Sequence, residues 1–318
     1  MGPVRISVVI PTKDRPQDLA KCLGSIFNQT LLPDEIVIVD CSTQKQLNSS
    51  IVAEANEKVK TIYLHTAPGL TYQRNRGIEA SSGDILLFLD DDIVLDKNFV
   101  KEIVNVFEND REQKVAGVYG NIVSPEKQHD LSLRQVLVWV IQAVNRLIAA
   151  VFFLSQNGNG RFRASGFPTY VHGAKETKRV ECLPGGLTAY RREVFAEFKF
   201  DENLHGYAYM EDDDFSYRLS RKYENVFTPY AKAFHNVSPA SRIGSAARER
   251  MLIENSHYLF KKNLPPTLKH KLAYYWAVLG LGLGAAISSI TGRDPGILKG
   301  FVVGLAIIMT PRRRRSAL

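Results

Sequence analysis

Three adjacent carboxylates, Asp90 to Asp92, directly follow the apolar run Ile85 to Leu89. Unit charges about 4 Å apart repel by roughly 1 kcal/mol in water and by about 4 kcal/mol at an effective dielectric of 20, so a strand with this ending needs a compensating partner. A divalent cation held by carboxylate oxygens would supply it and could bridge to substrate phosphates. A solvated turn or a helix N-terminus also favours aspartate. Taken alone, the stretch leaves a metal site and an ordinary turn equally open.

A second acidic cluster, Glu211 to Asp214, begins a segment whose pattern predicts a helix running to Lys222. Acidic side chains in the first turn cap backbone N–H groups and oppose the helix dipole. That role suffices for Asp213 and Asp214, but four adjacent acids exceed it. A carboxylate beside a hydroxyl can also accept its proton during a reaction. His235 lies downstream, and as a lone residue it fits an ordinary loop histidine.

The elements before these acids alternate between strand and helix, which predicts an α/β fold with a Rossmann-like, mostly parallel sheet flanked by helices. Continuous apolar strands such as Val8 to Ile10 and Ile36 to Val39 suit a parallel sheet covered on both faces. The expected strands are 5–12, 34–40, 60–65 and 84–90, and the expected helices are 16–28, 45–58 and 70–80.

Ligands bind such sheets outside the carboxyl ends of the strands. This rule places Pro11, Thr12 and Asp40 on the same edge as Asp90 to Asp92, because each directly follows or ends a strand. No GxGxxG motif follows the first strand and the chain has no GxxxxGK[ST] motif, which argues against dinucleotide binding of the dehydrogenase type and against a P-loop. The predicted edge site therefore needs another ligand.

The C-terminal part has the composition of a membrane-attached segment. The run Leu272 to Thr291 is uncharged and long enough for about 30 Å of helix, and a shorter apolar run, Gly296 to Met309, follows a turn. Basic residues flank both outer ends, and Arg312 to Arg315 supply part of the net charge of +8 and suit anionic lipids. We expect a helical hairpin at the membrane with both ends on the cytoplasmic side. Two buried core helices are the alternative.

These patterns predict two regions. Residues 1–242 form a catalytic domain, and residues 243–318 form a helical, membrane-associated region with a basic tail. Residues 131–165 interrupt the catalytic domain as an apolar helix, 131–154, followed by a polar, glycine-rich and mobile loop. The helix fits the membrane interface and a packed position equally well. Three widely spaced cysteines give neither a disulfide framework nor a metal pattern, and fit a reducing cytoplasmic setting.

In order along the chain, five stretches resemble the family 2 glycosyltransferases of the GT-A fold. They are "SVVIPTKDRPQDLAKCLGSIFNQT", "EIVIVDCST", "RNRGIEASSGDILLFLDDD", "PGGLTAYRREVF" and "FDENLHGYAYMEDDDFSYRL". The likeness covers roughly Val4 to Arg242. Each stretch is weak evidence alone, but the ordered set is specific. The third stretch resembles the DxD element of that family and the fifth its ED element.

The resemblance implies roles for particular residues. The residues implied to bind the nucleotide sugar are Pro11, Thr12, Arg15, Asp40, Arg74, Asp90 and Asp91. Asp92 and His235 are implied to bind Mn²⁺ or Mg²⁺, and Asp212 is implied to be the general base. The residues implied on the acceptor side are Gly185, Gly186, Glu211 and Arg218.

The resemblance also implies a reaction, which the chemistry supports. A departing nucleoside diphosphate builds up negative charge that a cation and an arginine stabilise, while a carboxylate takes the proton of the acceptor hydroxyl. One base without a carboxylate nucleophile implies a single displacement with inversion. No QxxRW element follows Asp212, which favours addition of one sugar over polymer synthesis, and Cys41 departs from the polar residue frequent in relatives, which leaves the base preference undetermined.

The apolar segments indicate a lipid-linked, polyprenyl-diphosphate-type glycan as acceptor, in synthesis of cell-envelope polysaccharide at the cell membrane. Two alternatives stay open: transfer to polyprenyl phosphate itself, which needs no general base, and a non-catalytic scaffold that only binds nucleotide. Nucleic acid is the weakest partner, because the arginine run is short and has no interleaved aromatic residues. Formation of homo-oligomers stays open.

Overall fold

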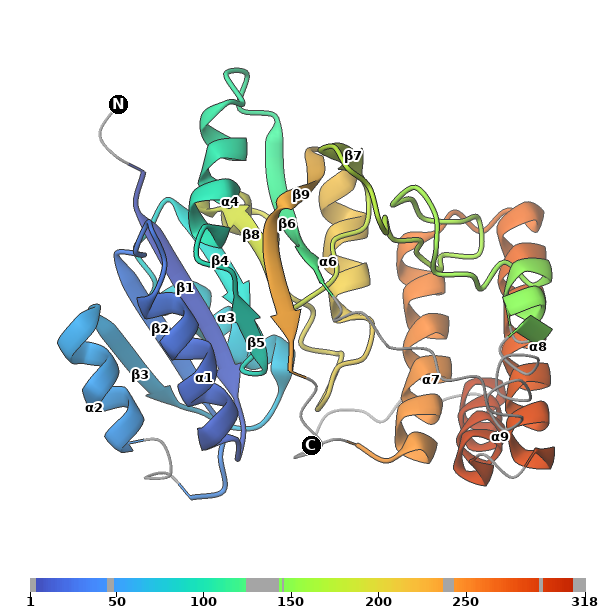
Figure 1. The fold of residues 1–318 in the computed structure, drawn as a ribbon. Helices are drawn as coiled ribbons and strands as arrows, with labels where there is room; N and C mark the ends of the chain where they lie inside the picture. Colours follow the sequence, from blue (N-terminus) through green and yellow to red (C-terminus); the bar gives the residue numbers. More distant parts are fainter. Residues whose placement is uncertain are drawn as a thin grey trace, which may run out of the picture. The chain divides into compact units, whose positions relative to one another are not determined.

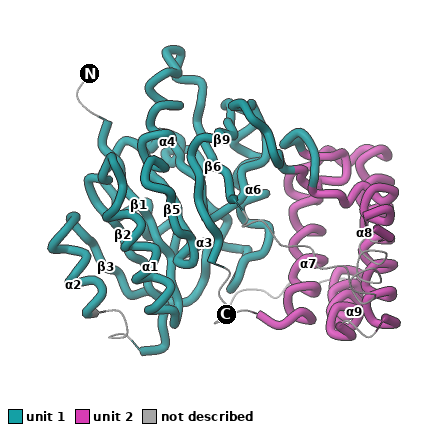
Figure 2. The backbone as a smooth tube through the Cα atoms, viewed as in Figure 1, with its two compact units in different colours: residues 1–126, 157–161, 170–242 teal, residues 127–156, 162–169, 243–318 magenta. Residues whose placement is uncertain are grey.

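The structure is a computed structural model that describes residues 4–44, 49–123, 143–144, 146–236, 243–291 and 294–310 (Figure 1). The chain divides into two compact units (Figure 2). The first comprises residues 1–126, 157–161 and 170–242, and the second comprises residues 127–156, 162–169 and 243–318. The division at residue 242 coincides with the predicted end of the catalytic domain, whereas residues 143–156 and 162–169 group with the C-terminal helices.

A sheet forms the centre of the first unit. In the described residues it has nine strands in the order β3-β2-β1-β4-β8-β6-β9-β5, with β7 paired to β9. The strands β3, β2, β1 and β4 are parallel to one another, and β8 runs antiparallel between β4 and β6. The strands are β1 (Ile6–Thr12), β2 (Glu35–Asp40), β3 (Thr61–His65), β4 (Ile85–Leu89), β5 (Ile93–Leu95), β6 (Val115–Ile122), β7 (Lys178–Val180), β8 (Leu187–Arg191) and β9 (Glu224–His235).

Helices cover both faces of this sheet, as the continuous apolar strands predict (Figure 1). In β1, Val8 and Ile10 join one core cluster with α1, α2 and α4, while Val9 joins the other with η1 and α6, because alternate side chains point to opposite faces. The helices are α1 (Pro16–Phe27), α2 (Ser49–Lys58), α3 (Leu70–Ala80), α4 (Phe99–Glu108), the 3-10 helix η1 (Arg192–Ala196) and α6 (Glu211–Ser220).

The expected elements of the parallel half are present, and the sequence explains their ends. Helix α1 begins with Pro16 at its first turn, where a missing N–H costs nothing, and buries Leu19, Leu23 and Ile26 against the sheet. Helix α3 has the predicted bounds. Of the helix expected over 45–58, residues 45–48 lie outside the described residues. The mostly parallel α/β fold is therefore confirmed.

Three helices form most of the second unit: α7 (Ser245–Asn263), α8 (Leu268–Ile290) and α9 (Pro295–Met309). Thr267 caps the start of α8 through the His270 backbone N–H. Helix α8 packs on α7 where the Tyr274 ring stacks on Phe260 with centroids 4.4 Å apart, and the Tyr274 hydroxyl lies 3.2 Å from Ser256 Oγ. The two predicted apolar runs thus lie in two helices.

The glycines of these helices allow close packing against several neighbouring segments. A Cβ at Gly300 of α9 would overlap the Ala246 carbonyl oxygen of α7, so this glycine allows α9 to lie close against α7. On α8, a Cβ at Gly280 would overlap the Phe152 side chain. Within the hairpin, a Cβ at Gly282 of α8 would meet the Phe301 ring of α9. Small residues therefore permit close packing between α8 and α9 and also against α7 and the segment before residue 157.

The predicted insertion is described only in part. Residues 143–144 and 146–151 are helical, and the remainder of the predicted helix up to residue 142 lies outside the described residues. The polar segment after it has defined turns where the sequence predicts a mobile loop. Phe162 and Pro168 form an antiparallel bridge, and the Arg163 N–H donates to the Phe167 carbonyl over 3.0 Å. Gly166, at φ 85°, supplies the left-handed conformation that the turn requires.

Candidate active site

Asp91 links the ends of β1 and β4. Its Oδ2 accepts a hydrogen bond of 2.7 Å from the Thr12 hydroxyl, and its Oδ1 lies 3.0 Å from the Arg15 guanidinium. Burial raises the pKa of Asp91 to about 6, while Thr12 and Arg15 oppose that shift. Thr12, Arg15 and Asp91 thus meet at the predicted edge, where their contacts with one another fix the turn after β4.

Asp92 lies beside His235, with 3.1 Å between Asp92 Oδ1 and His235 Nε2. Strand pairing produces this contact, because Ile93 of β5 pairs with His235 at the end of β9 and the Asn236 N–H donates to the Asp92 carbonyl. Arg15 Nη1 is 3.7 Å from the other Asp92 oxygen. The two residues predicted to bind metal are therefore neighbours, although they are far apart in the sequence.

The donor atoms of this pair fit a divalent cation that is completed by substrate. Among the described residues, no group of three His, Cys, Asp or Glu side chains could hold a metal ion by itself. A single carboxylate leaves coordination positions for water and phosphate oxygens, as in Mg²⁺ sites beside nucleotides. The imidazole nitrogen suits a transition metal ion better than Mg²⁺. Asp92 and His235 would hold such an ion.

Asp90 lies against the glycine pair that the sequence places on the acceptor side. The Asp90 N–H donates to the Gly186 carbonyl over 3.0 Å. Gly186 has φ 78°, and a Cβ there would overlap the Asp90 carboxylate. Only glycine satisfies both conditions. Glycine at position 186 is therefore required by the close approach of backbone and carboxylate.

Arg74 joins the two acidic clusters. Its Nη1 contacts Glu211 Oε1, and its Nη2 lies 3.5 Å from Asp90 Oδ1. Arg74 is 2% exposed and Glu211 4% exposed. Burial raises the pKa of Glu211 to about 8, and the Arg74 guanidinium opposes that shift. Arg74 is thus an interior countercharge in this structure, and its predicted contact with a diphosphate stays a prediction.

Asp212 differs from its neighbours, because it is half-buried and its partners are backbone groups. Its Oδ2 accepts 2.6 Å from the Gly185 N–H, and its Oδ1 accepts 3.1 Å from the Asp213 N–H. The next residue, Asp213, is buried and accepts 2.6 Å from the Tyr170 hydroxyl. Burial and the Asp212 charge raise the pKa of Asp213 well above its usual range. Asp212 keeps the accessibility that a general base needs.

Two predicted site residues have their side chains engaged elsewhere. Asp40 ends β2 beside Thr12, but it is fully buried, accepting from the Ser42 N–H over 2.7 Å and from the Tyr63 hydroxyl over 2.9 Å. Arg218 lies at the other end of α6 and binds Asp214 at 2.8 Å. Pro11, the remaining predicted residue, is buried inside β1.

The sequence did not predict two side chains that support this edge of the sheet. Gln73, on α3 beside Arg74, donates 3.1 Å to the Thr12 carbonyl and 2.7 Å to the Val39 carbonyl, and so ties the ends of β1 and β2 together. Tyr170 holds Asp213. The buried position of Gln73 on a helix next to an arginine is a weak signal. For Tyr170 the sequence holds none, because its partner is distant along the chain.

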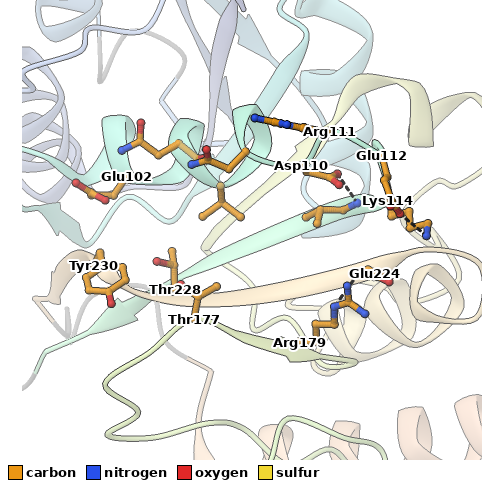
Figure 3. A pocket seen from close by; sticks show the side chains of 14 residues that line it. Glu102, Asp110, Arg111, Glu112, Lys114, Thr177, Arg179, Glu224, Thr228 and Tyr230 are labelled. Carbon is orange, nitrogen blue, oxygen red and sulfur yellow. Dashed lines mark hydrogen bonds and ion pairs between the residues drawn. The ribbon is translucent and has the colours of Figure 1, made fainter.

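A polar cavity of about 660 Å³ lies at the opposite end of the same sheet (Figure 3). Lys114, next to the start of β6, and Glu224, the first residue of β9, line it, at the edge away from Asp90. Two ion pairs lie within its wall: Arg179 lies 3.0 Å from Glu224, and Lys114 contacts Glu112. The cavity contains no predicted site residue. The carboxyl edge therefore stays the candidate active site.

Residues 7–198 match the family described as Glycosyl transferase family 2. The match covers more than half of the chain, and the chain belongs to this family of glycosyltransferases. The match includes β1, the aspartates after β4 and the glycine pair, whereas the acids at the start of α6 lie beyond it.

Similar proteins carry a range of activities in their names. The glucosyl-dolichyl phosphate glucuronosyltransferase of Haloferax volcanii is 25% identical over 119 residues, which is 36% of this chain and 37% of that protein. An N-acetylglucosaminyltransferase of Azorhizobium caulinodans is 26% identical over 195 residues, 60% of this chain and 43% of that protein. The chain thus spans less than half the length of these curated relatives.

The crystal structure of S. aureus TarS 1-349 shares the fold. It superposes with a TM-score of 0.50 at 16% sequence identity, covering 98% of this chain and 93% of that chain. Identity at this level shows the fold alone. The predicted glycosyltransferase fold is therefore confirmed, and the predicted membership of family 2 is confirmed by the family match.

Proposed function

We propose that this glycosyltransferase is attached to the membrane and transfers one sugar from a nucleotide diphosphate sugar to a lipid-linked glycan, with inversion at the anomeric carbon. The observation that carries the proposal is the position of Arg74. This buried guanidinium contacts Glu211 on the Asp212 side and approaches Asp90 on the Asp92 side. One edge of the sheet thus combines two residues that are candidates to bind a cation with a candidate general base.

The donor side would use the first acidic cluster. Asp92 and His235 would hold Mn²⁺ or Mg²⁺, which offsets negative charge on a leaving nucleoside diphosphate. Thr12, Arg15 and Asp91 fix the turn that presents Asp92. Because the leaving charge grows in the transition state, positive groups at this edge accelerate the reaction more than they strengthen donor binding.

The acceptor side would use Asp212. Hydrogen bonds from the Gly185 and Asp213 N–H groups orient its carboxylate. Asp212 would take the proton of the acceptor hydroxyl as the oxygen attacks the anomeric carbon. The bond to the diphosphate oxygen breaks as the new glycosidic bond forms, so a single displacement inverts the configuration.

The second unit supports a membrane setting. Helix α8 has 23 residues, and it is the one helix in the described residues that is long and apolar enough to cross a bilayer. Leu272, Leu279 and Val302 are each more than half exposed. Helix α9, with 15 residues, is shorter than the roughly 20 that a crossing needs. We propose attachment through α8, with the site on the cytoplasmic side and the acceptor carried by a lipid of the kind named for the Haloferax relative.

The test measures turnover with purified full-length protein in nanodiscs, with Mn²⁺, a panel of nucleotide sugars and a bacterial lipid extract. Nucleotide release and lipid mass are followed for the wild type, Asp92→Asn, Asp212→Asn and Glu108→Gln. Glu108 is an exposed carboxylate at the end of α4 and serves as the matched control.

We expect one donor to give a lipid mass increase of one sugar that both aspartate variants lose and Glu108→Gln keeps. Transfer that survives Asp212→Asn would favour a phosphate acceptor, because phosphate needs no general base. Metal-dependent nucleotide binding with no turnover on any donor would favour the scaffold. Label found only in water-soluble products would reject the lipid acceptor.

A further inference from the structure

The second unit contains a cavity whose walls suit an amphiphile. It measures about 880 Å³, within the usual range of roughly 300–1,000 Å³ for ligand pockets. Its apolar lining comes from α8 and from the end of the helical segment before residue 152. The lining residues are Val151, Phe153, Arg163, Ala164, Ser165, Lys269, Leu272, Ala273 and Trp276.

The α8 wall is a stripe with a cation at one end. Lys269, Leu272, Ala273 and Trp276 follow the i, i+3, i+4, i+7 spacing that places side chains on one helix face. From Lys269 to Trp276 the stripe extends about 10 Å along the axis. The Trp276 indole N–H is anchored by the Val151 carbonyl at 2.8 Å. The stripe is thus apolar along its length and positive at its N-terminal end.

The hairpin 162–168 adds polar groups whose hydrogen-bonding capacity is not used. Ser165 is 2% exposed, and its hydroxyl has no hydrogen-bond partner among the described residues. The same holds for Arg163 Nε, whereas Arg163 Nη2 donates 3.0 Å to the Ser155 carbonyl. A buried polar group without a hydrogen-bond partner is destabilising, so a ligand that bonds to both groups would be favoured. The lining contains no acidic residue.

We infer that this cavity binds the chain of a lipid phosphate, with the phosphate near Lys269, Arg163 and Ser165 and a single apolar chain along the stripe toward Trp276. Two cations and a hydroxyl select an anionic oxygen headgroup, and an apolar stripe about 10 Å long on one helix face suits a single apolar chain. The inference rests on the proposed function, because it makes this cavity the holder of the acceptor lipid. The cavity walls indicate a phosphate on a single apolar chain, and the proposed function makes that chain an isoprenoid.

The test measures binding without turnover, so its failure is separate from failure of the proposed reaction. Trp276 lines the cavity, and the chain has one other tryptophan, Trp139. In a Trp139→Phe background, the fluorescence of full-length protein in detergent therefore reports Trp276 alone. Farnesyl phosphate is titrated beside farnesol, which lacks the phosphate, and beside dihexanoylphosphatidylglycerol, which has two chains.

We expect saturable binding of farnesyl phosphate, and at least tenfold weaker binding of farnesol and of the two-chain lipid. Lys269→Gln should weaken farnesyl phosphate binding about tenfold, since a charge-assisted contact is lost, whereas Lys271→Gln, an exposed lysine outside the cavity, should not. Ala273→Phe should block the cavity, and Ala286→Phe on the same helix should leave binding unchanged.

Equal affinity for farnesol or for the two-chain lipid would overturn the inference, and so would equal effects of each variant and its control. Lysine 269 is exposed, so its variant folds even if Ala273→Phe does not. Suppose the nanodisc assay shows lipid mass increases, and Lys269→Gln leaves the KM for the lipid acceptor unchanged. The cavity then does not hold the acceptor, although the proposed reaction stands. If farnesyl phosphate binds but no donor turns over, the cavity stands without the proposed reaction.

Discussion

The two acidic clusters of the first unit are alike in sequence and differ in what surrounds them. Asp90 to Asp92 face two guanidinium groups, Arg74 and Arg15, and the His235 imidazole. The cluster at Glu211 to Asp214 is mostly buried at the start of a helix. The first cluster is thus balanced by positive charge at a sheet edge, which is where a diphosphate and its cation would compete for the same partners.

In the second cluster each acid has its own partner. Glu211 contacts Arg74 of α3, Asp213 accepts from Tyr170, and Asp214 binds Arg218 of the same helix. Asp212 is held by backbone N–H groups and is the most exposed of the four. Adjacent acidic residues therefore differ in their surroundings, and these surroundings determine which carboxylate can exchange a proton with a substrate.

The largest effect should separate Asp212 from its neighbours. Asp212→Asn removes the proton acceptor but keeps an oxygen for the Gly185 N–H, so we expect kcat to fall about 100- to 10,000-fold with an unchanged melting temperature. Nucleotide release at saturating donor and a thermal melt measure both. Glu108→Gln should change neither. A decrease in kcat of less than tenfold would place the base elsewhere and remove the distinction between Asp212 and the other three acids.

The next effect concerns the residue that joins the clusters. Arg74→Met leaves the Glu211 carboxyl buried without its partner, so we expect the free energy of unfolding to drop by about 3–5 kcal/mol, measured by urea denaturation in detergent. The double variant Arg74→Met with Glu211→Leu should recover most of that loss, because both buried charges are gone. If the double variant is as unstable as the single one, Arg74 stabilises the protein through Asp90 or through packing and not through Glu211.

Gly186 tests how tightly the first cluster is held. Gly186→Ala adds a Cβ into the Asp90 carboxylate at a positive φ, for which we expect a loss of stability of about 1–3 kcal/mol together with reduced activity. Gly24→Ala, where no atom lies within 4 Å of the new Cβ, should be neutral or slightly stabilising. Equal melting temperatures for the two variants would show that the contact at Asp90 is loose.

Much of the fold could be predicted from the sequence, because periodicity and the carboxyl-edge rule act locally. The strands ending at Thr12, Asp40 and Leu89 and the helix 70–80 follow from apolar runs and spacing. The segment 155–169 could not be predicted, since a turn closed by Phe162 and Pro168 depends on pairing that composition does not encode.

The candidate site could be predicted only in part. The sequence indicates which acids to consider, and the meeting of Asp92 with His235 follows once β5 and β9 pair. The sequence could not indicate which charged side chains pair with one another. Arg74 is an internal partner of Glu211, and Arg218 is taken by Asp214, because side chains from distant parts of the chain compete for the same carboxylates.

The smallest effect tests whether Asp213 takes part in catalysis. Tyr170→Phe removes the hydroxyl that donates to the buried Asp213 carboxyl, and the lost hydrogen bond should cost about 1–2 kcal/mol of stability. Because Asp212 keeps its own N–H donors, we expect kcat to stay within about threefold of wild type. Tyr207→Phe, at an exposed tyrosine, is the matched control for both measurements. If Tyr170→Phe instead lowers kcat as far as Asp212→Asn does while the melting temperature holds, the proton acceptor is the Asp212–Asp213 pair and not one carboxylate.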